Sequence, residues 1–341
     1  MNRIFKTFVT AILFAACCEF ARSQVAPATM LQIDTDNNVR YIYDTADVSA
    51  FVTVPTTITQ PYPLAGVPTF ATWVTVADIV AINGKPAKGI YLTRQVAINL
   101  APAPTAGQGI ADLVATNIVD RILVMLQPDG TPIGSIMMYG LDGGTPPPGS
   151  PTTSRQGNFA ITGGTGAFLG MRGQFESGPV VAGAVANRNA SVKEDPGKRR
   201  INGGGKAIFL LHLIPMSRPD IIVDASGPAV LHGNGFTRVT AANPATAGET
   251  LILYATGLGP TRPGVDPGQP FPASPQQIVN SPVDVTANDA TAQVLYAGGF
   301  PGSVDGYHVS FRLPPGTVPG EVRLRLTAAF IQGSEVKIAV K

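Results

Sequence analysis

The stretch ITGGTGAFLGMRG, residues 161–173, decides how the first half of the chain folds. Its glycines are Gly163, Gly164, Gly166, Gly170 and Gly173. Three glycines within four residues allow a turn with positive φ and let the backbone pass close to a neighbouring strand. We expect the next strand to begin at Phe168. The stretch does not fit a dinucleotide-binding loop, because Leu169 stands where that pattern needs glycine and no helix is predicted after it.

Strand patterns surround this stretch on both sides. The clearest covers residues 89–100, where Ile90, Leu92 and Val96 alternate with more polar residues at period two. Similar patterns occur at residues 39–43, 51–54, 71–82, 118–127, 133–141, 158–161, 168–176 and 206–214. Pro128, Asp129 and Gly130 predict a tight hairpin between two of these strands. Many short strands and almost no helix predict a closed barrel or a sandwich.

The glycine-rich stretch resembles the GGTGxFxxARG signature of dirigent proteins and allene oxide cyclases. That resemblance implies an eight-stranded antiparallel barrel around an apolar cavity, over residues 31–216. It is strong at the motif and only topological elsewhere. Met171 replaces the usual alanine of the signature, and the cysteine pair common in plant dirigent proteins is absent. In that family the motif is mostly architectural, so it supports the barrel more than any activity.

Three charged residues, Asp78, Arg94 and Asp120, lie on otherwise apolar strand faces. An unpaired buried charge costs several kcal/mol. Each is therefore part of a structural ion pair or a strand end, or lines the lumen and orients a ligand or acts as acid or base, or reflects a shifted strand register. Trp73, the only tryptophan, is expected in the core or lumen wall. These four residues are the candidate lumen site, and no catalytic residue is assigned.

A charged segment, residues 187–206, separates the last predicted strands of the first block. A solvated loop is the simpler interpretation, and a docking patch for an acidic partner is the alternative. A second strand-rich block follows from Asp220, so we place a domain boundary between residues 216 and 220.

The second block, residues 220–341, has its own recognisable strings. They lie at residues 228–232, 239–245, 248–261, 282–285, 292–298 and 307–314. Together they resemble the latter half of the Solibacter-type C-terminal module of secreted acidobacterial proteins, over roughly residues 226–341. Short alternating strands with Gly and Pro turns suggest an immunoglobulin-like β-sandwich. The resemblance implies attachment or interaction at a cell surface and no chemistry of its own.

The N-terminus predicts export. Arg3 and Lys6 precede a short apolar run, and small residues up to Ser23 suit a signal peptidase, so residues 1–23 are assigned as a signal peptide. The alternative is a lipoprotein acylated at Cys17. No later segment is long and apolar enough for a transmembrane helix, which predicts a secreted or cell-surface protein.

Composition excludes several functional classes. Charged residues make up 13% of the chain, against about 25% in an average soluble protein. Without the signal's Arg3, Lys6, Arg22 and Glu19, basic and acidic residues are equal in number, which argues against nucleic-acid binding. HExxH, GxSxG and CxxC motifs are absent, and the three histidines are isolated, so no metal site and no cofactor is predicted.

The sequence thus predicts an exported all-β protein whose barrel binds a small apolar ligand and whose C-terminal sandwich attaches it to an envelope or surface partner. One alternative is an isomerase, cyclase or dirigent-type coupling guide that acts on an apolar substrate in the lumen. Another is a structural or adhesive subunit that forms homo-oligomers.

Overall fold

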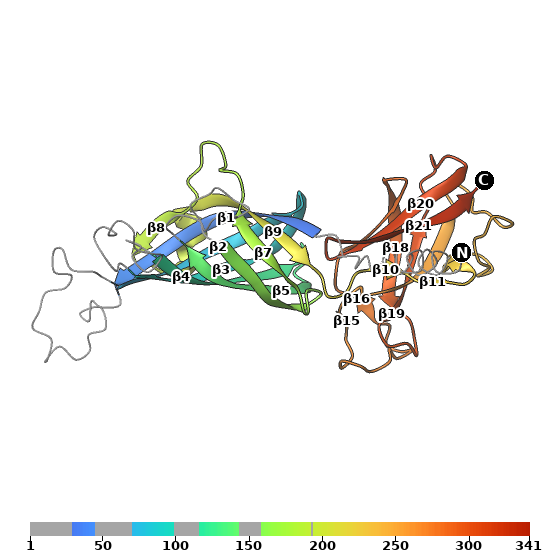
Figure 1. Cartoon of the computed structure of the whole chain (residues 1–341), viewed down its shortest axis with the longest axis horizontal. Coiled ribbons are helices and arrows are strands. Elements are labelled where there is room, and N and C mark those ends of the chain that lie inside the picture. Colours follow the sequence, from blue (N-terminus) through green and yellow to red (C-terminus); the bar gives the residue numbers. More distant parts are fainter. Residues whose placement is uncertain (1–28, 45–69, 99–115, 143–157, 192–193) are drawn as a thin grey trace, which may run out of the picture.

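The computed structural model describes residues 29–44, 70–98, 116–142, 158–191 and 194–341. Nearly all of its regular structure is β, as predicted (Figure 1). The predicted signal peptide with Cys17 and the predicted strand at 51–54 lie outside the described residues.

Eight antiparallel strands form a closed barrel, as predicted. They are β1 (Thr29–Asp44), β2 (Phe70–Ile82), β3 (Lys85–Ile98), β4 (Thr116–Leu126), β5 (Pro132–Asp142), β6 (Asn158–Gly166), β7 (Arg172–Ser177) and β9 (Gly205–Ile214). Each pairs with its neighbour in the order β2-β3-β4-β5-β6-β7-β9-β1, and pairing of β1 with β2 closes the ring. The short β8 (Arg188–Ser191) adds in parallel to β1 outside the ring.

The glycine-rich stretch forms the end of β6 and the turn into β7. A Cβ on Gly164 would lie 2.3 Å from the carbonyl oxygen of Phe168, so only glycine fits there. Phe168 does not begin the next strand as expected; it lies in a helical turn and is fully buried in the barrel core. The turn forms because the Phe168 and Leu169 amides donate to the carbonyls of Thr165 and Gly166, which delays β7 until Arg172.

The hairpin between β4 and β5 is confirmed. Gly130 donates its amide to the Gln127 carbonyl at 2.9 Å, with a positive φ of 93° that suits glycine. The Asp129 carboxylate accepts from the Thr131 amide at 2.8 Å.

The inner and outer faces of β3 are opposite to the hydrophobic pattern. Tyr91, Thr93 and Gln95 are buried toward the lumen, whereas Ile90 and Leu92 are exposed on the outer surface. The pattern was misleading because half of the lumen carries polar side chains, while the outer surface of this strand is rich in apolar ones.

The second unit is a connected, nearly closed sheet with its own apolar core. Its main path is β10 (Asp220–Ile221), β14 (Thr250–Thr256), β19 (Gly306–Arg312), β18 (Ala290–Gly299), β17 (Val283–Ala287), β20 (Gly320–Ala328) and β21 (Ile331–Val340). The shorter strands are β11 (Val223–Asp224), β12 (Gly227–Pro228), β13 (Val230–His232), β15 (Thr261–Arg262) and β16 (Ile278–Val279). The immunoglobulin-like arrangement stays a prediction.

The turn between β20 and β21 reaches into the barrel. Ala329, Phe330 and Ile331 are buried in the same cluster as the barrel core, not in the core of their own sheet. Polar contacts frame this junction: Lys85 Nζ lies 2.6 Å from Asp284 Oδ2, and Gln127 donates to the Asn280 carbonyl at 2.5 Å. The end of the barrel with the β2–β3 and β4–β5 turns is thus closed by the second unit (Figure 1). We call it the sealed end.

Candidate functional site

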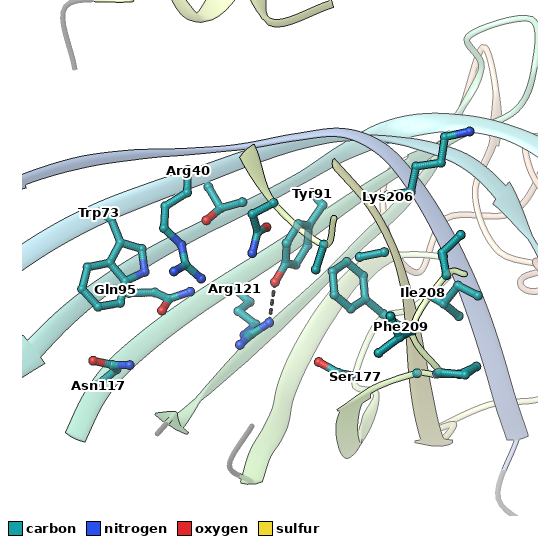
Figure 2. Close-up of a pocket in the computed structure, with 18 residues that line it drawn as sticks. Arg40, Trp73, Tyr91, Gln95, Asn117, Arg121, Ser177, Lys206, Ile208 and Phe209 are labelled. Carbon is teal, nitrogen blue, oxygen red and sulfur yellow. Dashed lines mark hydrogen bonds between the residues drawn. The ribbon is translucent and has the colours of Figure 1, made fainter. Parts of the chain in front are cut away.

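A cavity of about 420 Å³ lies in the other half of the barrel, toward the end away from the second unit. We call this the open end. Its walls come from the inner faces of β1, β2, β3 and β4 and from both faces of the first part of β9, with residues 177–181 and 186–187 along one side (Figure 2). The volume is within the range of small-molecule sites.

One lumen layer of the cavity is polar across four neighbouring strands. Arg40 pairs with Thr75, Thr75 with Thr93, and Thr93 with Arg121, so these residues form one row around the inner wall. Across β5 and β6 the row continues with Met138 and Ile161, both buried and apolar. The layer therefore has a polar half and an apolar half.

Arg121 lies deepest among the cations of the cavity. Its side chain is only 4% exposed and donates a hydrogen bond from Nη1 to the Tyr91 hydroxyl. The guanidinium stacks on Phe159 at 4.0 Å and on Phe175 at 4.7 Å, measured from Cζ to the ring centroids. Cation–π contacts of this kind stabilise a charge in a partly desolvated place.

Arg40 enters the same space from β1. Its Cζ lies 5.3 Å from the centroid of Trp73, again a cation–π distance. Figure 2 shows the guanidinium groups of Arg40 and Arg121 directed into the cavity, with Gln95 and Tyr91 beside them. Lys206 is a third basic residue of the lining, and none of the described residues that line the cavity is acidic.

Three further polar atoms in the cavity wall are buried and have no hydrogen-bond partner among the described residues. They are Trp73 Nε1, Thr75 Oγ1 and Gln95 Oε1. Buried polar atoms are almost always hydrogen-bonded in folded proteins. Their concentration at one cavity indicates that a ligand or bound water completes them.

The predicted lumen residues are divided by the structure. Trp73 lines the cavity, as expected for a lumen-wall side chain. Arg94 and Asp120 are directly paired on the outer surface of β3 and β4, with 69% and 41% of their side chains exposed. Arg94 Nη2 lies 2.5 Å from Asp120 Oδ2. Placing them in the lumen was therefore wrong, and the structural ion pair is the correct alternative.

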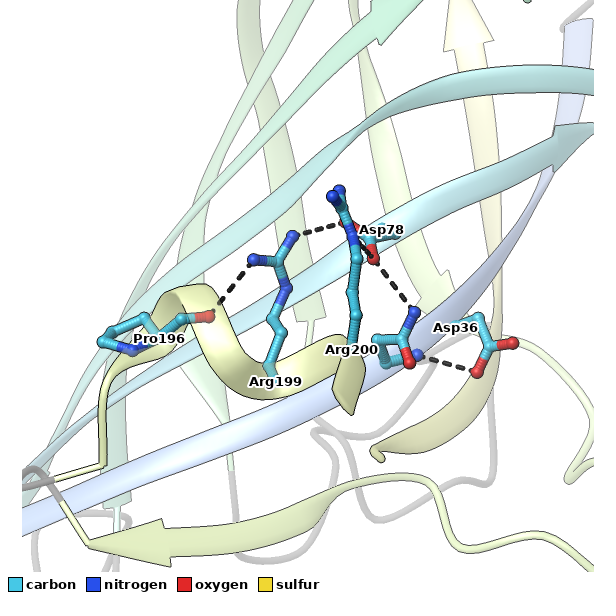
Figure 3. A network of polar contacts seen from close by, with 6 residues as sticks. Asp36, Asp78, Pro196, Arg199 and Arg200 are labelled. Atoms are coloured by element: carbon cyan, nitrogen blue, oxygen red, sulfur yellow. Dashed lines mark hydrogen bonds and ion pairs between the residues drawn. The ribbon is translucent and has the colours of Figure 1, made fainter. Parts of the chain in front are cut away.

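Asp78 is also outside the lumen. It is buried on the outer face of β2 beneath a short helical segment, the 3₁₀ turn η3 (Pro196–Lys198) and α2 (Arg199–Asn202) (Figure 3). Arg199, Arg200 and Asn37 all donate to its carboxylate. Burial raises the pKa of Asp78, but these hydrogen bonds outweigh it and lower the pKa to about 2.

The ion pair between Arg199 and Asp78 bears on the interpretation of the charged segment, residues 187–206. Arg188 binds Glu194 at 2.6 Å and the Gly203 carbonyl at 2.7 Å, so part of the charge is used within the segment. The interpretation as a merely solvated loop was wrong for Arg199, which is buried in the pair with Asp78. The segment is tied to the barrel by ion pairs.

Sequence reasoning missed Arg40, Tyr91, Gln95 and Arg121. Arg121 lies on the same strand face as Val119, Leu123 and Met125. This face is as apolar as the opposite one, on which Asp120 was singled out as a candidate. Applying the same test to both faces of that strand would have found it. No helix in the described part of the chain is long and apolar enough to cross a membrane. Over the same residues, no group of three or more potential metal ligands occurs.

Comparison with known proteins gives no further assignment. The chain matches no protein-family model, no curated protein and no solved structure. The function is therefore argued from the cavity itself.

Proposed function

We propose that the barrel is a binding module for a small molecule with an apolar body, and that the second unit holds the protein at a cell surface or on a partner after export. The carrying observation is the cavity with three buried polar atoms, Trp73 Nε1, Thr75 Oγ1 and Gln95 Oε1, that a bound molecule would complete. Each buried polar atom without a hydrogen-bond partner lowers the stability of the fold by about 1–3 kcal/mol. A barrel that served only as a scaffold would have no reason to keep three of them.

Apolar side chains in the cavity wall indicate a ligand with an apolar part, not only a polar ion. Apolar side chains from β9 and from the segment after β7 also line the cavity: Phe209, Ile208, Val180 and Val181. The rings of Tyr91 and Phe209 lie 4.5 Å apart and continue into the aromatic cluster of Phe175. An apolar body would bury against this wall while its polar part meets Gln95 and Thr75.

The test is untargeted mass spectrometry of small molecules that denaturation releases from protein purified out of its native exporter. Ala207 faces the cavity from β9, so Ala207→Phe fills space that a ligand needs. Leu92→Phe adds a ring on the outer surface and is the matched control. We expect a stoichiometric compound with the wild type and Leu92→Phe that is lost in Ala207→Phe. The same compound in equal amount in all three would contradict the proposal.

An isomerase or cyclase remains the enzyme candidate, with different residues from those expected. Arg94, Asp78 and Asp120 lie outside the lumen, so Tyr91 and Arg121 are the groups that could move or stabilise charge inside it. Turnover of a bound compound that Tyr91→Phe abolishes without loss of binding would favour this candidate. Binding without any product supports the binding module.

Self-association is favoured by a separate observation on the outer surface. Several large apolar side chains are exposed on adjacent strands: Ile90, Leu92, Val124, Met137 and Tyr139. Large exposed apolar patches are typical of interaction sites. Sedimentation velocity tests this: mass that rises with concentration supports a homo-oligomer, and a monomer at all concentrations contradicts it.

A further inference from the structure

The three buried polar atoms that lack a hydrogen-bond partner among the described residues lie close together on the inner wall. Trp73 on β2 is directly opposite Gln95 on β3, and Thr75 follows two residues later on the same face of β2. Residues directly opposite each other in an antiparallel pair have Cβ atoms about 5 Å apart. Figure 2 shows the side chains of Trp73 and Gln95 next to each other in the cavity. One polar group of a ligand can therefore reach all three side chains.

These atoms require both kinds of hydrogen-bonding partner. Trp73 Nε1 can only donate a hydrogen bond, and Thr75 Oγ1 can donate or accept one. Gln95 Nε2 donates to Thr93 Oγ1 at 3.5 Å, so the amide atom left without a partner in the described part of the chain is Oε1, which only accepts. Gln95 and Thr75 are 4% and 2% exposed, so bulk water does not satisfy them. A ligand group that completes the patch must accept from Trp73 and donate to Gln95.

The arginines of the cavity do not require a charged ligand. Arg121 donates a hydrogen bond to the Tyr91 hydroxyl. Arg40 stacks on the Trp73 ring, and both arginines have further interactions within the chain. A carboxylate has no hydrogen to donate and would leave Gln95 Oε1 buried beside another acceptor. An ammonium group has no lone pair to accept from Trp73 Nε1. An uncharged group with one acceptor and one donor satisfies both atoms.

We propose that the ligand of the lumen is an uncharged molecule whose head group both accepts and donates a hydrogen bond, as a carboxamide does. This inference rests on the proposed binding function and names its ligand class. The carbonyl oxygen accepts from Trp73 Nε1 and from the Thr75 hydroxyl, and the N–H donates to Gln95 Oε1. The apolar body lies against Tyr91 and Phe209, whose rings line the same cavity with their centroids 4.5 Å apart.

Two uncharged probes separate the donor of the head group from its acceptor. 3-Cyclohexylpropanamide and methyl 3-cyclohexylpropanoate share one apolar body and one carbonyl oxygen, but only the amide can donate. Trp73 is the only tryptophan and lines the cavity, so its fluorescence reports binding at this site in the full chain. Gln95→Met should weaken amide binding about tenfold and leave ester binding within about twofold, because only the amide loses a hydrogen bond there. Each probe is compared with itself across variants, so the different hydration of amide and ester does not affect the result.

Other variants test the remaining contacts. Thr75→Val should weaken binding of the amide and the ester by similar factors, because both carbonyl oxygens accept from that hydroxyl. Trp73→Phe, measured by calorimetry, should also weaken both. Gln293→Met removes an exposed amide on β18 and should change neither affinity. The acid 3-cyclohexylpropanoate should bind to the wild type more weakly than the amide, and this order carries the test if Gln95→Met does not fold.

The native compound gives an independent readout. The small molecule that denaturation releases should be uncharged at pH 7 and hold at least one hydrogen on nitrogen or oxygen, which deuterium exchange before mass spectrometry counts. An acid, or a compound without such a hydrogen, overturns the head-group inference and leaves the binding module intact. An equal loss of amide and ester binding in Gln95→Met, or tighter binding of the acid than of the amide, does the same. No binding of any probe also overturns the inference, whereas the released compound alone decides the binding function.

Discussion

The two ends of the barrel are built from the same eight strands but are closed in different ways. At the sealed end, the β20–β21 turn inserts Phe330 among apolar barrel side chains, and the second unit adds polar contacts around it. At the open end, the inner wall carries Arg40, Thr75, Gln95 and Arg121 around a cavity. One end is filled for stability, and the other keeps polar groups that stability alone does not require.

The charged residues of the barrel wall also differ between its outer and inner faces. Asp78, Arg94 and Asp120 face outward and are matched with opposite charges. Arg121 faces inward and is surrounded by aromatic rings and a phenol. The outer charges are neutralised by carboxylate–guanidinium pairs at the surface, whereas the guanidinium of Arg121 is held inside the barrel by a phenol and two aromatic rings.

The largest expected effect is at the sealed end. Phe330→Ala should lower the free energy of unfolding by about 3–5 kcal/mol, because it empties a buried ring site between the two units. Phe236 is a matched control: it also has a positive φ, of 52° against 66° for Phe330, but is 65% exposed. Phe236→Ala should change stability by less than about 0.5 kcal/mol. Denaturant unfolding followed by Trp73 fluorescence measures both, and similar losses would contradict the sealing role.

The next effect concerns the charged segment that is held on the outer face of β2 by Asp78. Asp78→Asn should lower the free energy of unfolding by roughly 2 kcal/mol at pH 7, because the carboxylate's pKa falls to about 2 in the folded chain. A lowered pKa stabilises the fold above the unfolded value near 4, and this contribution is lost as pH falls from about 4 to about 2.

The measurement is denaturant unfolding of wild type and Asp78→Asn between pH 2 and pH 7. The difference between them should be full at neutral pH and shrink below about pH 4. Asp120→Asn, which removes an exposed partner, is the control and should show little difference at any pH. A constant difference for Asp78→Asn down to pH 2 would show that its ionisation is not what stabilises the segment.

A smaller effect of opposite sign is expected in the open-end cavity. Thr75→Val should raise the free energy of unfolding by about 1 kcal/mol, because it removes a buried hydroxyl that lacks a partner among the described residues. Thr35 is the matched control on the neighbouring strand, since its hydroxyl donates to the Ala207 carbonyl at 2.9 Å. Thr35→Val should lower stability by about 1 kcal/mol.

The same two variants connect stability with binding. Thr75→Val should reduce the amount of the small molecule that denaturation releases, relative to the wild type, while it stabilises the fold. Thr75→Val could instead destabilise the chain as much as Thr35→Val does. The Thr75 hydroxyl would then have a fixed partner within the protein and would not be available to a ligand in the open-end cavity.

The smallest effect is expected on the outer surface. Arg94→Gln should change stability by less than about 1 kcal/mol, because the Arg94–Asp120 pair is exposed to solvent. Unfolding at low and high salt measures it. A loss of several kcal/mol would mean that this pair is buried in an assembly of the chain, which would favour the homo-oligomer.

Much of the barrel could be predicted from local sequence. Alternation in residues 89–100 predicts β3, Asp129 and Gly130 predict the hairpin, and the glycine at 164 marks a close approach that any Cβ would prevent. These features depend on neighbours along the chain or on one strand's own periodicity.

What could not be predicted depends on which face is inside and on distant contacts. Hydrophobicity selects the outer face of β3, because Thr93 and Gln95 occupy the inner one. No local pattern places Phe330 inside the barrel more than two hundred residues from β3. For the same reason the sequence pattern places Asp78 in the lumen. Only the fold shows that Asp78 pairs with Arg199 and Arg200 on the outer face.

The most direct test is a crystal structure of the full chain purified from its native exporter. The account predicts density for a bound small molecule in the open-end cavity, within hydrogen-bond distance of Trp73, Thr75 or Gln95, and Phe330 buried in the sealed end. An open-end lumen filled by protein side chains would contradict it.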